Sequence, residues 1–238
     1  MEFAIEVKDV TKSYGAHFTL QNINLQVKKG EVFALIGQNG AGKTTLVKLI
    51  LDLLRTNKGQ ITLATLPSSD SHSREKVGFI PEKFSFFSFY TVEGVLDFFA
   101  ETRGFTGAEK IKTVETALQK LSLEEIRTRK LSTFSKGQLQ RVGLATLLIG
   151  DLDILILDEP FSGLDPIGIK DLKDLIKEFK QQGKTVFINS HILLEMEQLC
   201  DSFAVLKNGK LVHSGSVASM KEQHGNLEDF FTKLVTES

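Results

Sequence analysis

The stretch GQNGAGKT at residues 37–44 decides how this sequence folds. A strand-like segment at 31–36, apolar from residue 32 onward, precedes it, and 44–54 carries apolar side chains on more than one face, as expected for a helix packed inside a domain. The stretch matches the pattern G-x-x-x-x-G-K-[ST] and lies between a strand and a helix, as that pattern requires. The N–H groups of such a loop, together with the N-terminus of the helix, point at phosphate oxygens. The sequence therefore predicts a strand, loop and helix unit that binds a nucleotide.

The residues of this loop have separate expected roles. Lys43 is expected to reach the β- and γ-phosphates, and Thr44 to ligate Mg²⁺. A glycine-rich turn with an incidental lysine is the alternative interpretation. The nucleotide-binding residues predicted here are Gly37, Gln38, Asn39, Gly40, Ala41, Gly42, Lys43, Thr44 and Thr45.

Outward from this unit, strand-like and helix-like segments alternate along the chain. This alternation predicts an α/β fold with a largely parallel sheet. From about residue 84 to 150 the pattern is mainly helical, so a helical insertion interrupts the sheet. Asn208-Gly209 lies between two strand-like runs, which predicts a hairpin because both turn positions need a positive φ.

A second candidate site follows the apolar run at 154–157, where Asp158 and Glu159 come at the carboxyl end of a buried strand. Asp158 is expected to hold Mg²⁺ through its water shell. Glu159, on the other side of the strand, is expected to take the proton from an attacking water. A solvated strand end is the alternative interpretation of this pair.

Composition excludes several classes of protein. The 238 residues are 41% hydrophobic and 25% charged, within the ordinary globular range. Lys and Arg number 29 against 30 Asp and Glu, so no uniform positive field exists to hold nucleic acid or an anionic membrane. Cys200 is the single cysteine, which excludes an internal disulfide. The N-terminus lacks the pattern of a signal peptide, and every apolar run is far shorter than the ~20 residues that span a bilayer.

Further motifs follow in order along the chain. Residues 134–138 read FSKGQ, residues 162–166 read SGLDP, and Ser190-His191 ends a strand-like run. With the loop at 37–44 and the run at 154–159, these motifs agree in order and spacing with the ATP-binding subunits of the ABC transporter family. The sequence resembles that family over nearly its whole length.

The resemblance implies a fold and a domain organisation. The expected fold is an α/β phosphate-loop NTPase of the ABC type, with a mixed, mainly parallel core sheet, an antiparallel β lobe and an inserted helical subdomain. A single ABC ATPase domain is expected over 1–238, with a core lobe at about 1–82 and 151–238 and a helical subdomain at about 83–150.

The resemblance also implies an ATP site shared between two copies of the chain. His191 would contact the γ-phosphate and assist Glu159 in catalysis, and Tyr14 would stack on adenine, with a half-buried strand tyrosine as the alternative. Glu82 stands where many members have a metal-contacting glutamine, and Lys136 replaces a commoner glycine. Metal ligands are thus expected at Thr44, Glu82 and Asp158. The residues expected to act on the ATP of the opposite copy are Ser135, Lys136, Gly137, Gln138 and Asp165.

Aromatic residues concentrate after Glu82. Seven of the 18 Phe lie between residues 79 and 99, and an exposed aromatic cluster is typical of a protein interface. The hypothesis is a groove that receives a short helix of a membrane partner, and the alternative is subdomain core. The residues assigned to this groove are Phe84, Phe86, Phe87 and Phe89.

The function implied by the resemblance is ATP hydrolysis, with ATP and Mg²⁺, that energises a membrane transporter through closure of a head-to-tail homodimer. The motifs look most like bacterial subunits that pair with separately encoded exporter-type (ABC-2-like) permeases. Such a subunit would be peripheral, on the cytoplasmic face of the inner membrane, and would bind no nucleic acid. A soluble ABC-type ATPase acting on a cytosolic complex is the alternative function, and a non-catalytic nucleotide-binding regulator is a third.

Overall fold

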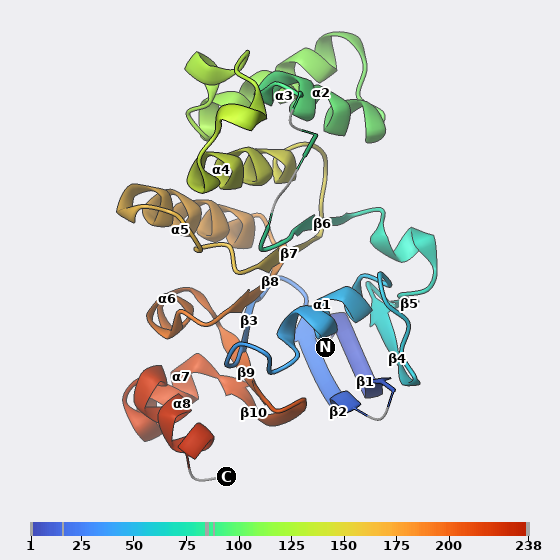
Figure 1. Cartoon of the computed structure of the whole chain (residues 1–238), viewed down its shortest axis with the longest axis vertical. Helices are drawn as coiled ribbons and strands as arrows, with labels where there is room; N and C mark the ends of the chain where they lie inside the picture. Colours follow the sequence, from blue (N-terminus) through green and yellow to red (C-terminus); the bar gives the residue numbers. More distant parts are fainter. Residues whose placement is uncertain (1, 16, 84–85, 88, 237–238) are drawn as a thin grey trace.

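The computed structural model describes residues 2–15, 17–83, 86–87 and 89–236. Helices α2, α3 and α4 lie at one end of the molecule, and α7 and α8 lie at the other (Figure 1). The strands are β1 (Phe3–Tyr14), β2 (His17–Lys28), β3 (Val32–Ile36), β4 (Lys58–Leu63), β5 (Leu66–Pro67), β6 (Val77–Ile80), β7 (Ile154–Asp158), β8 (Thr185–Ser190), β9 (Ser202–Lys207) and β10 (Lys210–Ser216). The helices are α1 (Lys43–Ile50), α2 (Val92–Thr102), α3 (Gly107–Lys120), α4 (Lys136–Leu147), α5 (Pro166–Gln181), α6 (Leu193–Leu199), α7 (Val217–His224) and α8 (Leu227–Thr236), with short 3-10 turns at Ser71–Arg74, Glu124–Ile126 and Leu131–Thr133.

The central sheet has six strands in the order β10-β9-β3-β8-β7-β6. All neighbours are parallel except β9 and β10, which form the antiparallel hairpin expected from Asn208-Gly209. Every residue of β3, β7 and β8 is buried, as in a parallel sheet covered on both faces. The carboxyl ends of the parallel strands meet at one edge, so the segments that follow β3, β6, β7 and β8 converge there.

A second, antiparallel sheet of order β2-β1-β4-β5 covers α1 on the side away from the central sheet. The side chains of β3 alternate between two cores, since strand residues point to opposite faces in turn. Phe33 and Leu35 pack with α1 and the second sheet, whereas Val32, Ala34 and Ile36 pack with the helices on the other face. The expected α/β fold with an antiparallel β lobe is confirmed.

Helix α1 is shorter than the 44–54 expected from the sequence. It ends at Ile50, and Asp52 takes a left-handed conformation with φ of 54°. A helix cannot continue through that backbone conformation. Leu53 beyond it is exposed, so the apolar pattern of the sequence continues past the end of the helix.

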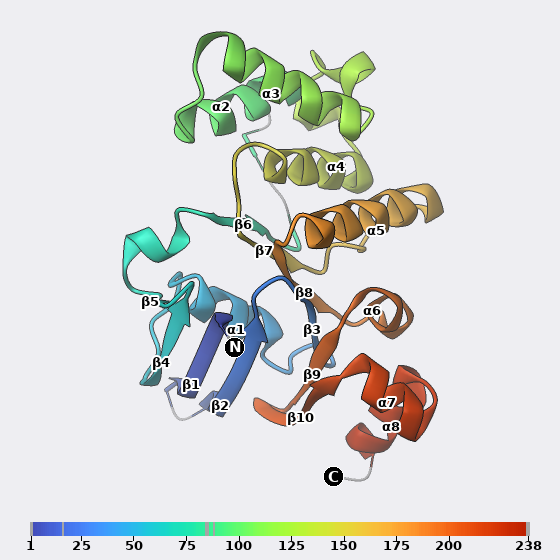
Figure 2. The same cartoon turned by 180° about the vertical axis from the view of Figure 1, so that it is seen from behind.

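The helical end consists of α2, α3 and α4, and Figure 2 shows α2 and α3 far from the C-terminal helices. Thr91 caps α2 by accepting a hydrogen bond from the N–H of Gly94 at 3.1 Å. Through the described part of the chain, no helix combines the length and apolar character needed to cross a membrane. Cys200 is buried, and burial raises the pKa of its thiol.

Candidate active site

The loop at 37–42 connects β3 to α1 and has a backbone that only glycine fits at its last position. Gly42 has φ of 108°, and a Cβ there would lie 2.8 Å from Leu20 Cδ2 and 3.0 Å from the carbonyl oxygen of Thr19. Gly42 is also the residue before α1, so no side chain caps the first N–H groups of that helix, and its first turn contains no acidic residue. Uncapped N–H groups with the positive end of the helix dipole attract an anion.

Lys43 begins α1 and is buried, with 6% of its surface exposed. Its Nζ donates hydrogen bonds to the carbonyl oxygens of Gly37 at 2.7 Å and Gln38 at 3.3 Å, and lies 3.7 Å from Glu159 Oε1. Burial lowers the pKa of Lys43, and the negative charges of Glu159 and Asp158 oppose that effect. The ammonium group is therefore held at the centre of the loop, among oxygen atoms.

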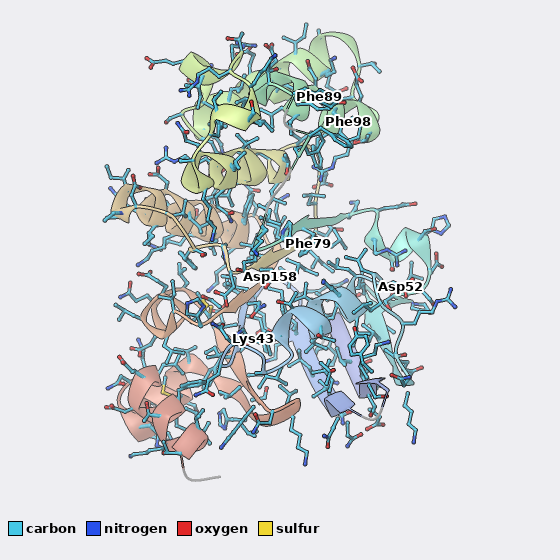
Figure 3. All side chains as sticks on the ribbon, viewed as in Figure 1. Lys43, Asp52, Phe79, Phe89, Phe98 and Asp158 are labelled. Carbon is cyan, nitrogen blue, oxygen red and sulfur yellow. The ribbon has the colours of Figure 1, made fainter. Side chains whose placement is uncertain are left out.

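Asp158 is the last residue of β7 and is buried close to this lysine, in the middle of the molecule (Figure 3). It accepts hydrogen bonds from the Asn189 amide and from the Thr44 side chain. Burial raises the pKa of its carboxyl, and these two hydrogen bonds lower it in part. The carboxylate and the hydroxyl of Thr44 are thus adjacent oxygen donors.

Glu159 follows β7 in a left-handed conformation with φ of 50°. Its backbone N–H donates to the carbonyl oxygen of Asn189 at 2.8 Å, and its Oε2 lies 2.8 Å from Nδ1 of His191. Because β7 ends at Asp158, a turn, and not the alternation of the strand, determines the direction of the Glu159 side chain. Non-glycine residues in this region cost about 1–3 kcal/mol and cluster at functional sites.

A cavity of about 430 Å³ brings most of the expected ATP-site residues together, and its size is that of a small-molecule site. Tyr14 does not line this cavity: it is half-exposed near the tip of the β1–β2 hairpin, with Lys12 Nζ 5.0 Å from its ring centre. Three loop residues also lie outside the lining, namely Gly37, Gln38 and Ala41. The residues lining the cavity are Thr19, Asn39, Gly40, Gly42, Lys43, Thr44, Thr45, Glu82, Glu159, Ser162 and His191.

The oxygen donors near the cavity suit Mg²⁺, which also takes phosphate and water ligands, better than a metal that is ligated by protein side chains alone. Among the described residues, no group of three or more His, Cys, Asp and Glu side chains could hold a metal ion. Thr44, Glu82 and Asp158 instead supply one hydroxyl and two carboxylates. Mg²⁺ in nucleotide sites takes one or two carboxylates and completes its shell with phosphate oxygens and water, so these residues fit the ion.

A second cavity, of about 510 Å³, lies beside the N-terminus of α4. Ser135 and Gln138 form a capping box there, since Ser135 Oγ accepts from the N–H of Gln138 at 3.3 Å and Gln138 Oε1 accepts from the N–H of Ser135 at 3.0 Å. Asp165 caps α5 by accepting from the N–H of Gly168 at 2.7 Å. Four of the five residues expected to act on the opposite copy's ATP therefore line one cavity, and Lys136 lies outside it.

The aromatic segment after β6 divides into a packed part and an exposed part. Phe86 is half-buried against Tyr90 and Phe98, with ring centres 5.2 and 5.7 Å apart. Phe87 and Phe89 are 68% and 65% exposed and stack on each other at 5.5 Å. Phe89 and Phe98 lie together on the helical end in Figure 3. Phe84 falls outside the described residues.

Three residues near the ATP-site cavity were not in the expected set. Thr19 and Ser162 line it, and Asn189 is fully buried beside it, where it contacts both Asp158 and Glu159. A polar residue at the carboxyl end of an otherwise apolar strand is the signal that points to Asn189. Thr19 lies in β2, distant in sequence, and carries no such signal.

Comparison with known proteins identifies the family of this chain. Residues 20–162 match the family described as ABC transporter. An uncharacterized ABC transporter ATP-binding protein of Synechocystis is 38% identical over 91% of this chain, and the chain spans 64% of the length of that relative. The lantibiotic transport ATP-binding protein SrtF of Streptococcus pyogenes is 36% identical, with 97% of each sequence covered.

Two solved structures are similar as well. The structure of an ATP-binding subunit of an ABC transporter has a TM-score of 0.89 and 33% identity, and covers 97% of this chain and 99% of its own. A dimeric ATP-binding cassette in a post-hydrolysis state, bound to ADP and Pi, has a TM-score of 0.83 and 25% identity over 90% of this chain and 98% of its own. The chain therefore belongs to the ABC transporter family, as an ATP-binding subunit with an ABC-type ATPase domain.

Proposed function

We propose that this chain binds and hydrolyses ATP to energise a membrane transporter, and that this transporter is an exporter. The observation that carries the proposal is the cavity in which the buried Lys43, at the start of α1, meets Glu159 after β7 and His191 after β8. These three groups supply a phosphate-binding cation, a proton acceptor and a partner that orients the acceptor.

ATP would bind with its phosphates at the N-terminus of α1. The N–H groups of the loop and Nζ of Lys43 would hold the β- and γ-phosphates. Tyr14 would stack on the adenine, since its half-exposed ring is accessible at the β lobe. Thr44, Glu82 and Asp158 are the residues that would hold Mg²⁺, and the ion would supply positive charge that offsets the negative charge developing on the phosphates.

Hydrolysis would begin at Glu159. Its carboxylate would accept a proton from a water, whose oxygen forms a bond to the γ-phosphorus as the bond to the β-phosphate oxygen breaks, leaving ADP and phosphate. His191 Nδ1 lies 2.8 Å from Oε2 and would fix the direction of this carboxylate. The other nitrogen of the His191 ring would then face the γ-phosphate. The left-handed backbone at Glu159 holds the base in position before the substrate binds.

A second copy of the chain would complete each ATP site. Ser135, Gly137, Gln138 and Asp165 line a cavity of their own, and the N-terminus of α4 there suits the γ-phosphate of a nucleotide bound to the other copy. The similarity to a dimeric cassette bound to ADP and Pi supports this arrangement. ATP would close the two copies head to tail, and hydrolysis would open them.

A permease would take up this movement. The exposed rings of Phe87 and Phe89, with Phe86 beneath them, are the proposed contact for a short helix of that membrane protein. We also propose that residues 83–150 form a subdomain which moves relative to the core lobe of 1–82 and 151–238. The chain would then act as a peripheral subunit on the cytoplasmic face of the membrane. A relative named as a lantibiotic transport protein favours this function over an ATPase acting on a cytosolic complex.

The variant Glu159→Gln tests the hydrolytic part of the proposal. It should bind Mg-ATP with wild-type affinity, lose at least about 99% of turnover, and elute as a dimer in ATP but not in ADP. Phosphate release gives the turnover, and size-exclusion chromatography gives the oligomeric state. Wild-type turnover in Glu159→Gln would remove this residue as the base. Reconstitution with the copurifying membrane protein then tests coupling to transport.

A further inference from the structure

The N-terminus of α4 is fastened to the turn between β7 and α5 by one side chain. Lys136 is the first residue of α4, and its Nζ donates a hydrogen bond to Ser162 Oγ at 2.7 Å. Its aliphatic stem lies over Gly163, where a Cβ would be 2.8 Å from Lys136 Cδ and 3.1 Å from Cγ. Gly163 has φ of 82°, so both the backbone and the space at this position favour glycine.

The backbones of the two segments also lie close together. A Cβ at Gly137 would be 3.0 Å from the carbonyl oxygen of Gly163, a separation that real side chains seldom have. The start of α4 is thus seated directly on the turn, and Lys136 closes over the contact. The two segments are 26 residues apart in sequence at this hydrogen bond.

The same turn borders both cavities. Ser162 lines the cavity that holds Lys43 and Glu159, and its N–H donates to the carbonyl oxygen of Glu159 at 3.1 Å. The next residue, Gly163, lines the cavity beside Ser135. A displacement of α4 would therefore reach Glu159 through the Lys136 hydrogen bond, the backbone contact between Gly137 and Gly163, and one turn.

We propose that Lys136 is a positioning residue that couples the two ATP sites of a dimer. When the start of α4 contacts the ATP bound to the second copy, the hydrogen bond from Lys136 displaces Ser162. Ser162 in turn positions the backbone of Glu159 in the ATP site of the first copy. The inference rests on the proposed function, because it requires ATP hydrolysis by two copies. It assigns a role to the lysine at 136, whose Nζ is hydrogen-bonded to Ser162.

A double-mutant cycle tests the proposal. Lys136→Met retains the stem over Gly163 and removes the donor, Ser162→Ala removes the acceptor, and the double variant removes both. Each single variant should lower kcat about threefold to tenfold with KM changed less than twofold, since one hydrogen bond is lost and the phosphate loop is untouched. The Hill coefficient for ATP should fall toward 1. The double variant should be no slower than the slower single variant.

Two variants serve as controls. Lys136→Arg retains a hydrogen-bond donor. The amount by which its Hill coefficient exceeds 1 should be at least half of the wild-type amount. Lys173→Met is matched in chemistry, because Lys173 also joins two elements, through Gln198 at 2.5 Å and Glu195 at 2.7 Å, and lines neither cavity. It should leave the Hill coefficient unchanged. Circular dichroism melting establishes that every variant folds.

Two results would overturn the inference. If the losses of the single variants multiply in the double variant, Lys136 acts independently of Ser162, as it would by touching the phosphate of the second copy directly. If the Hill coefficient stays at its wild-type value in Lys136→Met, the coupling does not pass through this residue. Failure of the proposed function has a separate signature, since wild-type protein would then release no phosphate or Glu159→Gln would retain its turnover.

Discussion

The turn at Asn208-Gly209 supports the phosphate loop, and Gly209→Ala is the variant that measures this support. The Gly209 N–H donates to the carbonyl oxygen of Ala41 at 3.0 Å, and its carbonyl oxygen accepts from the N–H of Gln21 at 2.7 Å. The turn therefore joins β2 to the loop. Gly209 has φ of 76°, and a Cβ there would lie 3.0 Å from the carbonyl carbon of Thr19 and nearer still to its oxygen.

The chain offers a matched control for this substitution. Gly183 has the same φ of 76°, and nothing lies within 4 Å of a Cβ placed there. Gly183→Ala should lower the free energy of unfolding by about 1 kcal/mol, which is the cost of a left-handed alanine. Gly209→Ala adds overpacking of about 1–3 kcal/mol, because the clash is with backbone that must shift. Its total loss should be about 2–4 kcal/mol.

Urea denaturation followed by circular dichroism gives both free energies, and a fluorescent ATP analogue gives the dissociation constants. Displacement of the turn should pull on Ala41, so Gly209→Ala should also weaken nucleotide binding about threefold or more, while Gly183→Ala should not. Equal losses of stability in the two variants would refute the argument, because they would show that the turn yields to the added methyl group at no cost.

Asp158→Asn should raise the free energy of unfolding at pH 7.5 by about 1 kcal/mol, because the raised pKa of Asp158 means that folding disfavours the charged carboxylate. Urea denaturation at lower pH should show a smaller gain, because wild-type Asp158 becomes protonated, and so uncharged, as the pH falls through its folded-state pKa. Phe87→Ser with Phe89→Ser should reduce copurification of a membrane protein at least fivefold, whereas Ile111→Ser, at an equally exposed apolar position on α3, should not. Cys200 should react with a maleimide at least 100-fold faster in urea than in the folded protein, because it is buried and its thiol pKa is raised.

Much of the fold follows from patterns that are local in the sequence. The apolar runs before residue 37 and before Asp158 form the buried strands β3 and β7, because only a strand covered on both faces needs apolar side chains at every position. Asn208 and Gly209 both take positive φ, as the two-residue hairpin requires. The end of α1 could not be predicted, because the apolar pattern continues past the left-handed Asp52.

Most residues of the candidate site were predictable from the sequence, but their geometry was not. Lys43, Glu159 and His191 follow three separate strands, and the parallel order of those strands brings their carboxyl ends to one edge. The direction of Glu159 depends on a turn held by the carbonyl oxygen of Asn189, a contact between residues 30 positions apart. Strand alternation, which uses only neighbouring residues, has no access to such a contact.

The sequence by itself determined the phosphate loop and the hairpin at Asn208, because both depend on backbone rules that act within a few residues. Only the tertiary structure decided that the lysine at 136 reaches Ser162, and that the ring of Tyr14 lies outside the lining of the ATP-site cavity. These outcomes depend on which distant segments pack together, and packing is decided by the burial of the whole chain.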